Sequence, residues 1–173
     1  SFLASTLGAT AAMTTLAHWS NTARAADPTS SDPLRLGLMT YNLARDWDLD
    51  TVIKNCTETG IEHVELRTTH AHGVETTLSK ADRERVRKRL EDSGLKWSLA
   101  SGFAYHWDDP AKVRENIEGT KEYTLLARDI GALGIRVFPN GLLADQGIPE
   151  EKTIEQIARS AAEVARFAAD YGV

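Results

Sequence analysis

The polar residues best suited to chemistry in this sequence gather around a short apolar segment at residues 61–66. Ile61, Val64 and Leu66 make up its apolar positions, and this short run predicts a buried strand. Side chains able to bind a ligand or move a proton lie around its carboxyl end: Glu65, Arg67, His70 and His72. Ligands bind at the carboxyl ends of strands in parallel sheets and barrels, so we interpret this end as a candidate site.

The charged residues of this strand alternate with its apolar ones. Successive side chains of a strand point to opposite faces, so Glu65 and Arg67 are expected on one side. In a barrel that side is either the interior mouth or the helix layer, and the charge favours the mouth, where they would contact a ligand. The alternative is a strand-end ion pair without a ligand. His70 and His72 could both face a metal ion or a sugar, and the alternative is a pair of solvent-exposed loop histidines.

Further candidates follow the other predicted strands. Residues 102–109 are rich in aromatic side chains. Trp107 and its neighbours could form an apolar wall against a sugar, with His106 as a hydrogen-bonding partner, or could fill the top of a barrel. Arg136, in the fourth predicted strand, suits an anionic or phosphorylated ligand. The predicted substrate-binding set is Asn42, Glu65, Arg67, His70, His72, His106, Trp107, Arg136 and Asn140.

These side chains must be positioned by an alternation of short apolar strands and amphipathic helices. The predicted strands are residues 34–41, 61–66, 95–101 and 135–138. The predicted helices are residues 49–59, 80–93, 110 to 130 or 133, and 150–170. Asp48, Ser79 and Asp109 are the expected N-caps, with Pro110 at the first helical position. The order predicts an α/β fold of parallel (β/α) units, the first four of a TIM (β/α)8 barrel. A compact four-stranded doubly wound sheet is the alternative.

Composition limits the partners of this domain. The chain has 173 residues, 42% of them hydrophobic, and a formal net charge of −5, which suits one globular core. An acidic chain lacks the basic face that nucleic acid requires, so we expect no nucleic-acid partner. The single cysteine, Cys56, is expected as a buried structural thiol.

The amino end has the features of an export signal. Residues 1–25 contain no acidic residue and have a moderately apolar core that is too short to span a membrane. Ala23 and Ala25 provide the small-residue pattern of a signal-peptidase site. Ser1-Phe2-Leu3 matches the residues that follow two arginines in twin-arginine signals. We therefore expect export to the periplasm, a linker at residues 26–33, a domain at residues 34–173 and no membrane span in the mature protein; a flexible tail is the alternative.

Three phrases of the sequence resemble one family. They begin at Gly37, Gly60 and Gly94 and read GLMTYN, GIEHVELR and GLKWSL. In this order they resemble the sugar phosphate isomerase/epimerase family, which has the xylose isomerase-like TIM barrel. The resemblance covers residues 34–173, which correspond to the amino-terminal half of that barrel. It implies a divalent metal ion held by Glu, Asp, His and Glu of later strands. The first of these is expected on the strand beginning at Val173, so no metal ligand is assigned within this chain.

The resemblance implies a metal-dependent isomerase or epimerase of a sugar or related polyol, working by proton transfer next to a carbonyl. The alternative is a non-catalytic carbohydrate-binding barrel. A nuclease of the endonuclease IV type is a third hypothesis, but its metal-binding histidines are absent from the ends of strands three and four. We expect a small-molecule sugar or polyol as partner, and self-association into a homo-oligomer.

Overall fold

A parallel four-stranded sheet organises residues 34–173, the part of the chain that this computed structural model describes. The predicted export segment and linker lie outside the described residues. The strands are β1 (Gly37–Met39), β2 (His63–Arg67), β3 (Lys96–Ala104) and β4 (Ile135–Phe138). Their order in the sheet is β1-β2-β3-β4, with every neighbouring pair parallel.

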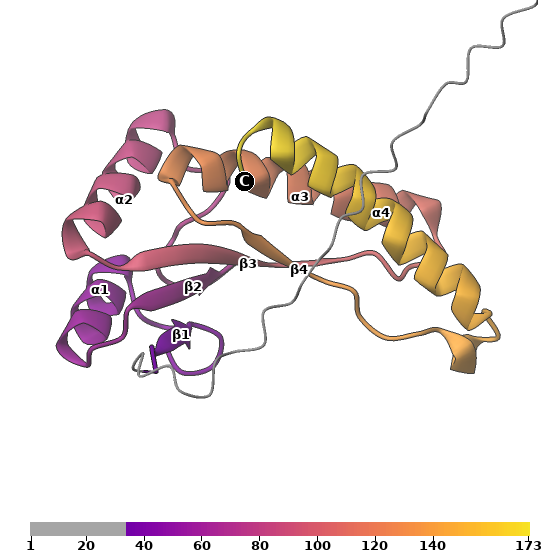
Figure 1. The fold of residues 1–173 in the computed structure, drawn as a ribbon, viewed down its shortest axis with the longest axis horizontal. Coiled ribbons are helices and arrows are strands. Elements are labelled where there is room, and N and C mark those ends of the chain that lie inside the picture. Colours follow the sequence, from indigo (N-terminus) through magenta and orange to yellow (C-terminus); the bar gives the residue numbers. More distant parts are fainter. Residues whose placement is uncertain (1–33) are drawn as a thin grey trace, which may run out of the picture. The chain divides into compact units, whose positions relative to one another are not determined.

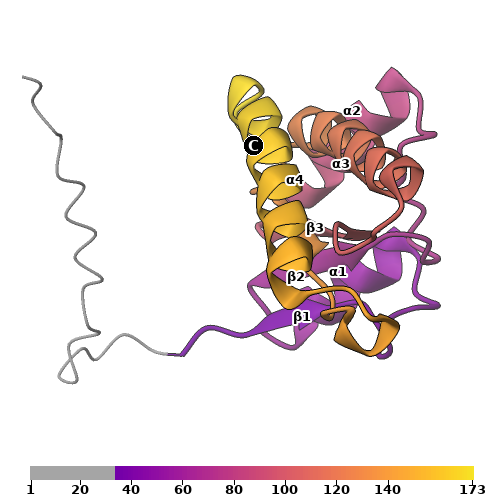
Figure 2. The same ribbon diagram turned by 90° about the vertical axis from the view of Figure 1, so that its right-hand side faces the viewer.

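This sequential order decides between the two predicted architectures. A doubly wound sheet reverses its direction of winding at a switch point, whereas each crossover here steps to the next strand on the same side. Because such crossovers are right-handed, they place the helices on one face of the sheet. The helices accordingly follow one another around the strands, each packed against the next (Figure 1, Figure 2). The described chain therefore forms the first four units of a TIM barrel.

The helices begin where the sequence places their caps. Their bounds are α1 (Leu49–Glu58), α2 (Lys80–Ser93), α3 (Pro110–Ile130) and α4 (Glu150–Asp170), with a short 3-10 helix, η1 (Ala144–Gln146), before α4. The side chains of Asp48, Ser79 and Asp109 accept hydrogen bonds from first-turn backbone N–H groups. No helix of this part of the chain is long and apolar enough to cross a membrane.

Two strands differ from the prediction. β1 spans three residues instead of eight, and Leu36 before it is exposed. β3 continues past Ser101, through a shift in its pairing with β4 between Ala100 and Ala104. The hydroxyl of Ser101 donates a hydrogen bond to the carbonyl of Arg136 across that shift. Part of the predicted aromatic loop therefore belongs to a strand.

The main core lies between the sheet and the helices. Val64 and Leu66 of β2 and Leu99 of β3 pack there with Cys56, which is fully buried as predicted. Further large members from the helices and β3 include Val52, Leu90, Trp97, Leu126 and Ile130. The apolar residues of β2 thus anchor one face of the strand and leave its charged residues on the other.

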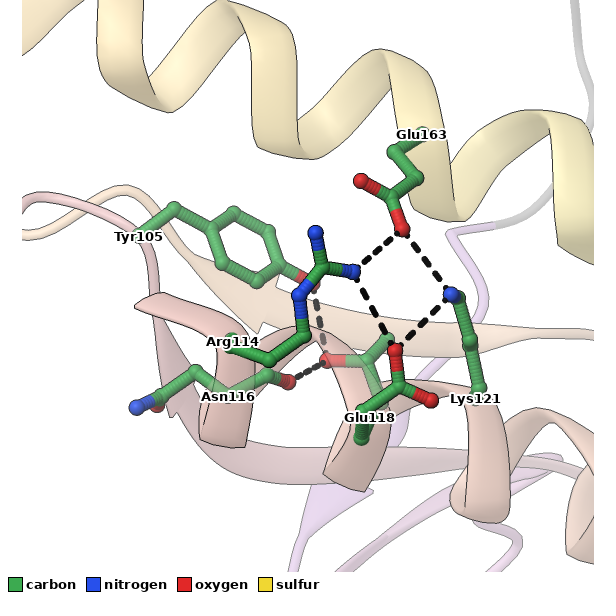
Figure 3. Close-up of polar contacts among 7 residues, drawn as sticks. Tyr105, Arg114, Asn116, Glu118, Lys121 and Glu163 are labelled. Carbon is green, nitrogen blue, oxygen red and sulfur yellow. Dashed lines mark hydrogen bonds and ion pairs between the residues drawn. The ribbon is translucent and has the colours of Figure 1, made fainter. Parts of the chain in front are cut away.

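Helix α4 packs on α3 through a face that overlaps only partly with its predicted apolar stripe. Of the residues in that stripe, Ile154, Ala158 and Ala165 are exposed, whereas half-buried positions are Ile157, Ala161 and Ala168. The buried residues are Thr153, Ser160 and Val164. Ion pairs add to this contact, since Glu163 of α4 accepts hydrogen bonds from both Arg114 and Lys121 of α3, each at 2.9 Å (Figure 3).

Candidate functional site

The face of the sheet opposite the main core carries the charged residues. In β2 the exposure alternates, with Val64 and Leu66 fully buried and Glu65 and Arg67 partly exposed. The prediction that these two charged side chains share one side is therefore confirmed. In a closed barrel this face is the interior.

Glu65 is held by an arginine from β4 rather than by its neighbour Arg67. Arg136 donates Nε–H to Oε1 of Glu65 at 2.8 Å and Nη2–H to Oε2 at 2.9 Å. This two-point contact spans β3, which lies between the two strands. The hydrogen bonds from Arg136 stabilise its charged form and raise its pKa. The pair is therefore a fixed wall of the face, and neither carboxylate oxygen of Glu65 is free.

Beside this pair, a hollow of about 380 Å³ opens at the carboxyl ends of the strands. The guanidinium carbon of Arg67 lies 4.6 Å from the centre of the Tyr41 ring, in the geometry of a cation–π contact. Within residues 34–173 no carboxylate pairs with Arg67, so its charge is available to a ligand. The hollow is lined by Met39, Tyr41, Arg67, Gly102, Arg136, Phe138 and Asn140.

The two histidines of the following loop are buried rather than exposed. The Val74 backbone N–H donates to Nδ1 of His72 at 3.0 Å, and Nε2 of His72 lies 2.8 Å from the carbonyl oxygen of Arg67. Since Nδ1 accepts, the proton resides on Nε2, and both ring nitrogens are engaged by backbone. The prediction that His72 binds a ligand therefore gives way to a structural role, in which it fixes the loop after β2.

His70 is connected to the sheet through Thr40. The Thr40 hydroxyl accepts a hydrogen bond from the Arg67 N–H at 3.0 Å and lies 3.1 Å from Nδ1 of His70. Burial, and then the positive charges of Arg67 and Arg45, lower the pKa of His70. Burial also lowers the pKa of His72. Both imidazoles are thus biased toward the neutral form.

The remaining predicted residues do not join the hollow. Asn42 is exposed and accepts a hydrogen bond from Arg45. His106 and Trp107 line a different cavity, between α3 and α4. The hollow also contains residues that the sequence reasoning missed, above all Tyr41 and Phe138. Their signal was available, because each is an aromatic residue at or just past the carboxyl end of a predicted strand.

Residues 34–173 contain no cluster of three or more candidate metal ligands. Among them, no group of three or more His, Cys, Asp or Glu side chains lies close enough to hold an ion. The carboxylate of Glu65 is bound by Arg136 and the ring nitrogens of His72 by backbone. The engaged ring nitrogens of His72 argue against the hypothesis that His70 and His72 together face a metal ion.

Sequence and structure comparisons then define the relationship of this chain to known proteins. A family model described as xylose isomerase-like TIM barrel matches residues 53–173. The chain belongs to this family. No curated protein matches the chain in sequence.

Several solved structures share the fold of this chain. D-psicose 3-epimerase from Clostridium cellulolyticum H10, solved with D-tagatose, matches with a TM-score of 0.66 and 14% identity, covering 81% of this chain and 50% of that one. The IOLI protein with a bound zinc atom matches with a TM-score of 0.65 and 19% identity, covering 81% of this chain and 49% of that one. A probable 3-DHS dehydratase, AsbF, from Bacillus anthracis matches with a TM-score of 0.59 and 18% identity, covering 81% of this chain and 50% of that one. The chain spans about half the length of these structures.

Proposed function

We propose that the complete protein is a metal-dependent isomerase or epimerase acting on a sugar or related polyol, by proton transfer next to a carbonyl. Family membership supports the class of enzyme, and the similar structures include epimerases named for their sugar substrates. A divalent metal ion belongs to the proposal, and when bound it would polarise the substrate carbonyl. Among residues 34–173 no group of three or more His, Cys, Asp or Glu side chains could hold it, so no step is assigned to it.

The observation that carries the proposal is the hollow around Arg67 on the interior face. It combines an unpaired cation with aromatic walls, Tyr41 and Phe138, at the carboxyl ends of parallel strands. Sugars suit such a lining, because hydroxyl and carbonyl oxygens accept hydrogen bonds from a guanidinium while ring carbons pack on aromatic faces. Arg67 would orient the substrate, and the Glu65–Arg136 pair would hold the neighbouring wall in place.

Isotope exchange on the complete protein tests the reaction. A ketose such as D-fructose, incubated with enzyme in D2O, should gain deuterium at the carbon next to the carbonyl. Chelation should abolish the exchange, and added divalent metal should restore it. A protein that binds the sugar without exchange would instead be a carbohydrate-binding barrel, and the proposed reaction would be wrong.

Arg67 can be tested in the same assay. Arg67→Met should lower kcat/KM by about tenfold or more, equivalent to about 1.4 kcal/mol of transition-state binding. Arg85→Met is the matched control, since Arg85 lies on the exposed surface of α2. Equal activities of the two variants would place the substrate elsewhere.

Export is a separate part of the proposal and rests on residues 1–25. Mass spectrometry of the periplasmic protein should find Ala26 as its first residue. An uncleaved protein retained in the cytoplasm would contradict the export proposal and would leave the proposed reaction unaffected.

A further inference from the structure

A second cavity lies between α3, α4 and the connection from β3 to α3. Its volume is about 450 Å³, and it shares no lining residue with the hollow around Arg67. His106 and Trp107 line it from the connection, and Thr153 lines it from the first turn of α4. Apolar wall is contributed by Pro110, Val113, Ile117 and Ile148. The cavity is therefore distinct from the site proposed above.

Three polar atoms of this lining are buried without a hydrogen-bond partner. They are Nδ1 of His106, Nε1 of Trp107 and Oγ1 of Thr153. His106 is 9% exposed and Thr153 is 2% exposed. Buried polar groups in folded proteins nearly always have a partner. Within residues 34–173 these are the three buried side-chain polar atoms that lack one, and all three belong to residues of this cavity.

The charged side chains that line the cavity are ion-paired, and the ammonium of Lys112, 4.7 Å from the centre of the Trp107 ring, lies outside this lining. Lys152 lies 2.6 Å from Asp108, Arg114 lies 2.9 Å from Glu163 (Figure 3), and Arg159 lies 3.0 Å from Glu155. Burial lowers the pKa of His106 and so favours its neutral imidazole. The unused hydrogen-bonding capacity therefore belongs to neutral groups, namely an indole donor, a hydroxyl and an imidazole nitrogen.

We propose that this cavity binds a neutral polyhydroxylated molecule of about the size of a hexose. One ligand hydroxyl can accept from the Trp107 indole N–H, while others pair with Nδ1 of His106 and with the Thr153 hydroxyl. Small-molecule sites span about 300–1,000 Å³, so the volume suits such a ligand. It greatly exceeds the roughly 30 Å³ that one water molecule occupies in the liquid. A phosphorylated or carboxylated ligand would find no unpaired cation among the residues that line the cavity.

The indole N–H of Trp107 provides a direct readout in the complete protein. The 173 residues described by this sequence include four tryptophans, and the Trp107 signal in a proton–nitrogen NMR spectrum is assigned by its loss in Trp107→Phe. Sorbitol and D-glucose, added separately, should shift it saturably with at least one of the two probes. Trp97 is the internal control, because its indole N–H already donates to the carbonyl of Ile130 at 3.1 Å. Its signal should stay in place.

Matched threonine variants test the geometry. Thr153→Val keeps the side-chain shape but removes the unpartnered hydroxyl, and should weaken the apparent affinity by about threefold to tenfold. Thr124→Val is the control, because Thr124 is equally buried but donates to the Thr120 carbonyl and does not line the cavity. The affinity of the Thr124→Val variant should match that of the parent protein.

Several results would overturn the proposal. One is a Trp107 signal that neither sorbitol nor D-glucose moves at about 100 mM, where a site with a Kd of about 1 mM would be saturated. Equal weakening by both threonine variants is another. A saturable shift with inorganic phosphate alone would refute the neutral ligand class. Sorbitol has no carbonyl, so these results stand independently of the proposed isomerase reaction.

Discussion

Glu65 and Arg136 are 71 positions apart in the sequence, yet each contributes two atoms to one contact on the interior face. The side chains are 21% and 38% exposed, so water screens the pair only in part. An ion pair of this kind costs most when one partner is removed, because the other is left without its counter-charge.

Glu65→Gln should therefore lower the free energy of unfolding by about 1–2 kcal/mol, since the amide keeps the shape but loses the charge. Glu62→Gln is the matched control, because Glu62 and its partner Arg35 are 56% and 71% exposed, and it should cost about 0.5 kcal/mol or less. Urea unfolding of the full chain measures both. Equal costs would show that the Glu65–Arg136 pair is not a structural contact.

The His72 loop predicts a pH dependence. The ordinary pKa of a histidine is 6.5, and burial lowers the pKa of His72 in the folded protein. Between the two pKa values the unfolded chain binds more protons, so stability is fully present above about pH 6.5 and falls as the pH drops through the folded pKa. Protonation would also remove the hydrogen bond from the Val74 N–H to Nδ1.

His72→Asn should reduce this loss of stability on acidification from about pH 7.5 to about pH 5, because the amide oxygen can still accept from Val74 but does not titrate. The remaining slope would come from groups such as His70 and His106, whose pKa values burial also lowers. Urea unfolding across this range measures the slope. An unchanged slope in His72→Asn would contradict the assigned role.

At the scale of elements, α3 approaches β3 at one glycine. A Cβ atom built on Gly119 would lie 2.5 Å from Cζ of Phe103. Phe103 in turn packs edge-on against Tyr123, with ring centres 5.6 Å apart. Glycine within a helix normally costs about 1 kcal/mol relative to alanine, so close packing gives its presence here a reason.

Gly119→Ala should destabilise the chain by about 1–3 kcal/mol, the usual range for overpacking, instead of stabilising it. In a Phe103→Leu background, where the ring is gone, the same change should be neutral or stabilising by up to about 1 kcal/mol. Thermal or urea unfolding of the parent, the two single variants and the double variant measures this double-mutant cycle. A stabilised Gly119→Ala single variant would show that the ring moves aside freely.

At the scale of the whole molecule, residues 34–173 form an open half of a closed architecture. Within the described sheet, β1 and β4 each pair on one side only. Ile154 on the outer surface of α4 is 55% exposed, and Leu133 before β4 is 66% exposed. Unpaired strand edges and exposed apolar side chains favour contact with another chain.

The 173-residue chain, expressed alone, should therefore associate or be poorly soluble. Sedimentation velocity should reveal species larger than a monomer, increasing with concentration. Ile154→Lys, which places a charge on the exposed surface of α4, should reduce the association. A monodisperse monomer with a sharp cooperative melt would contradict this expectation.

The sequence by itself determined the order, type and approximate bounds of the elements, because caps and apolar spacing are local signals. Asp48, Ser79 and Asp109 cap their helices as expected, and the period of two in β2 correctly placed Glu65 and Arg67 on one side. Local signals failed where packing decided: the buried face of α4 depends on where α3 lies, and β1 is shorter than predicted, with Leu36 before it exposed.

Only the tertiary structure decided which candidate residues act together. Sheet order brought Arg136 to Glu65, and loop geometry turned His72 toward backbone groups. His106 and Trp107 come just after the end of β3 in the sequence, and Arg67 stands at the end of β2. They nevertheless line the cavity between α3 and α4 and not the hollow on the interior face that Arg67 lines. Sequence spacing restricts a residue to an edge of the sheet, whereas the direction of its side chain depends on long-range contacts that no local pattern contains.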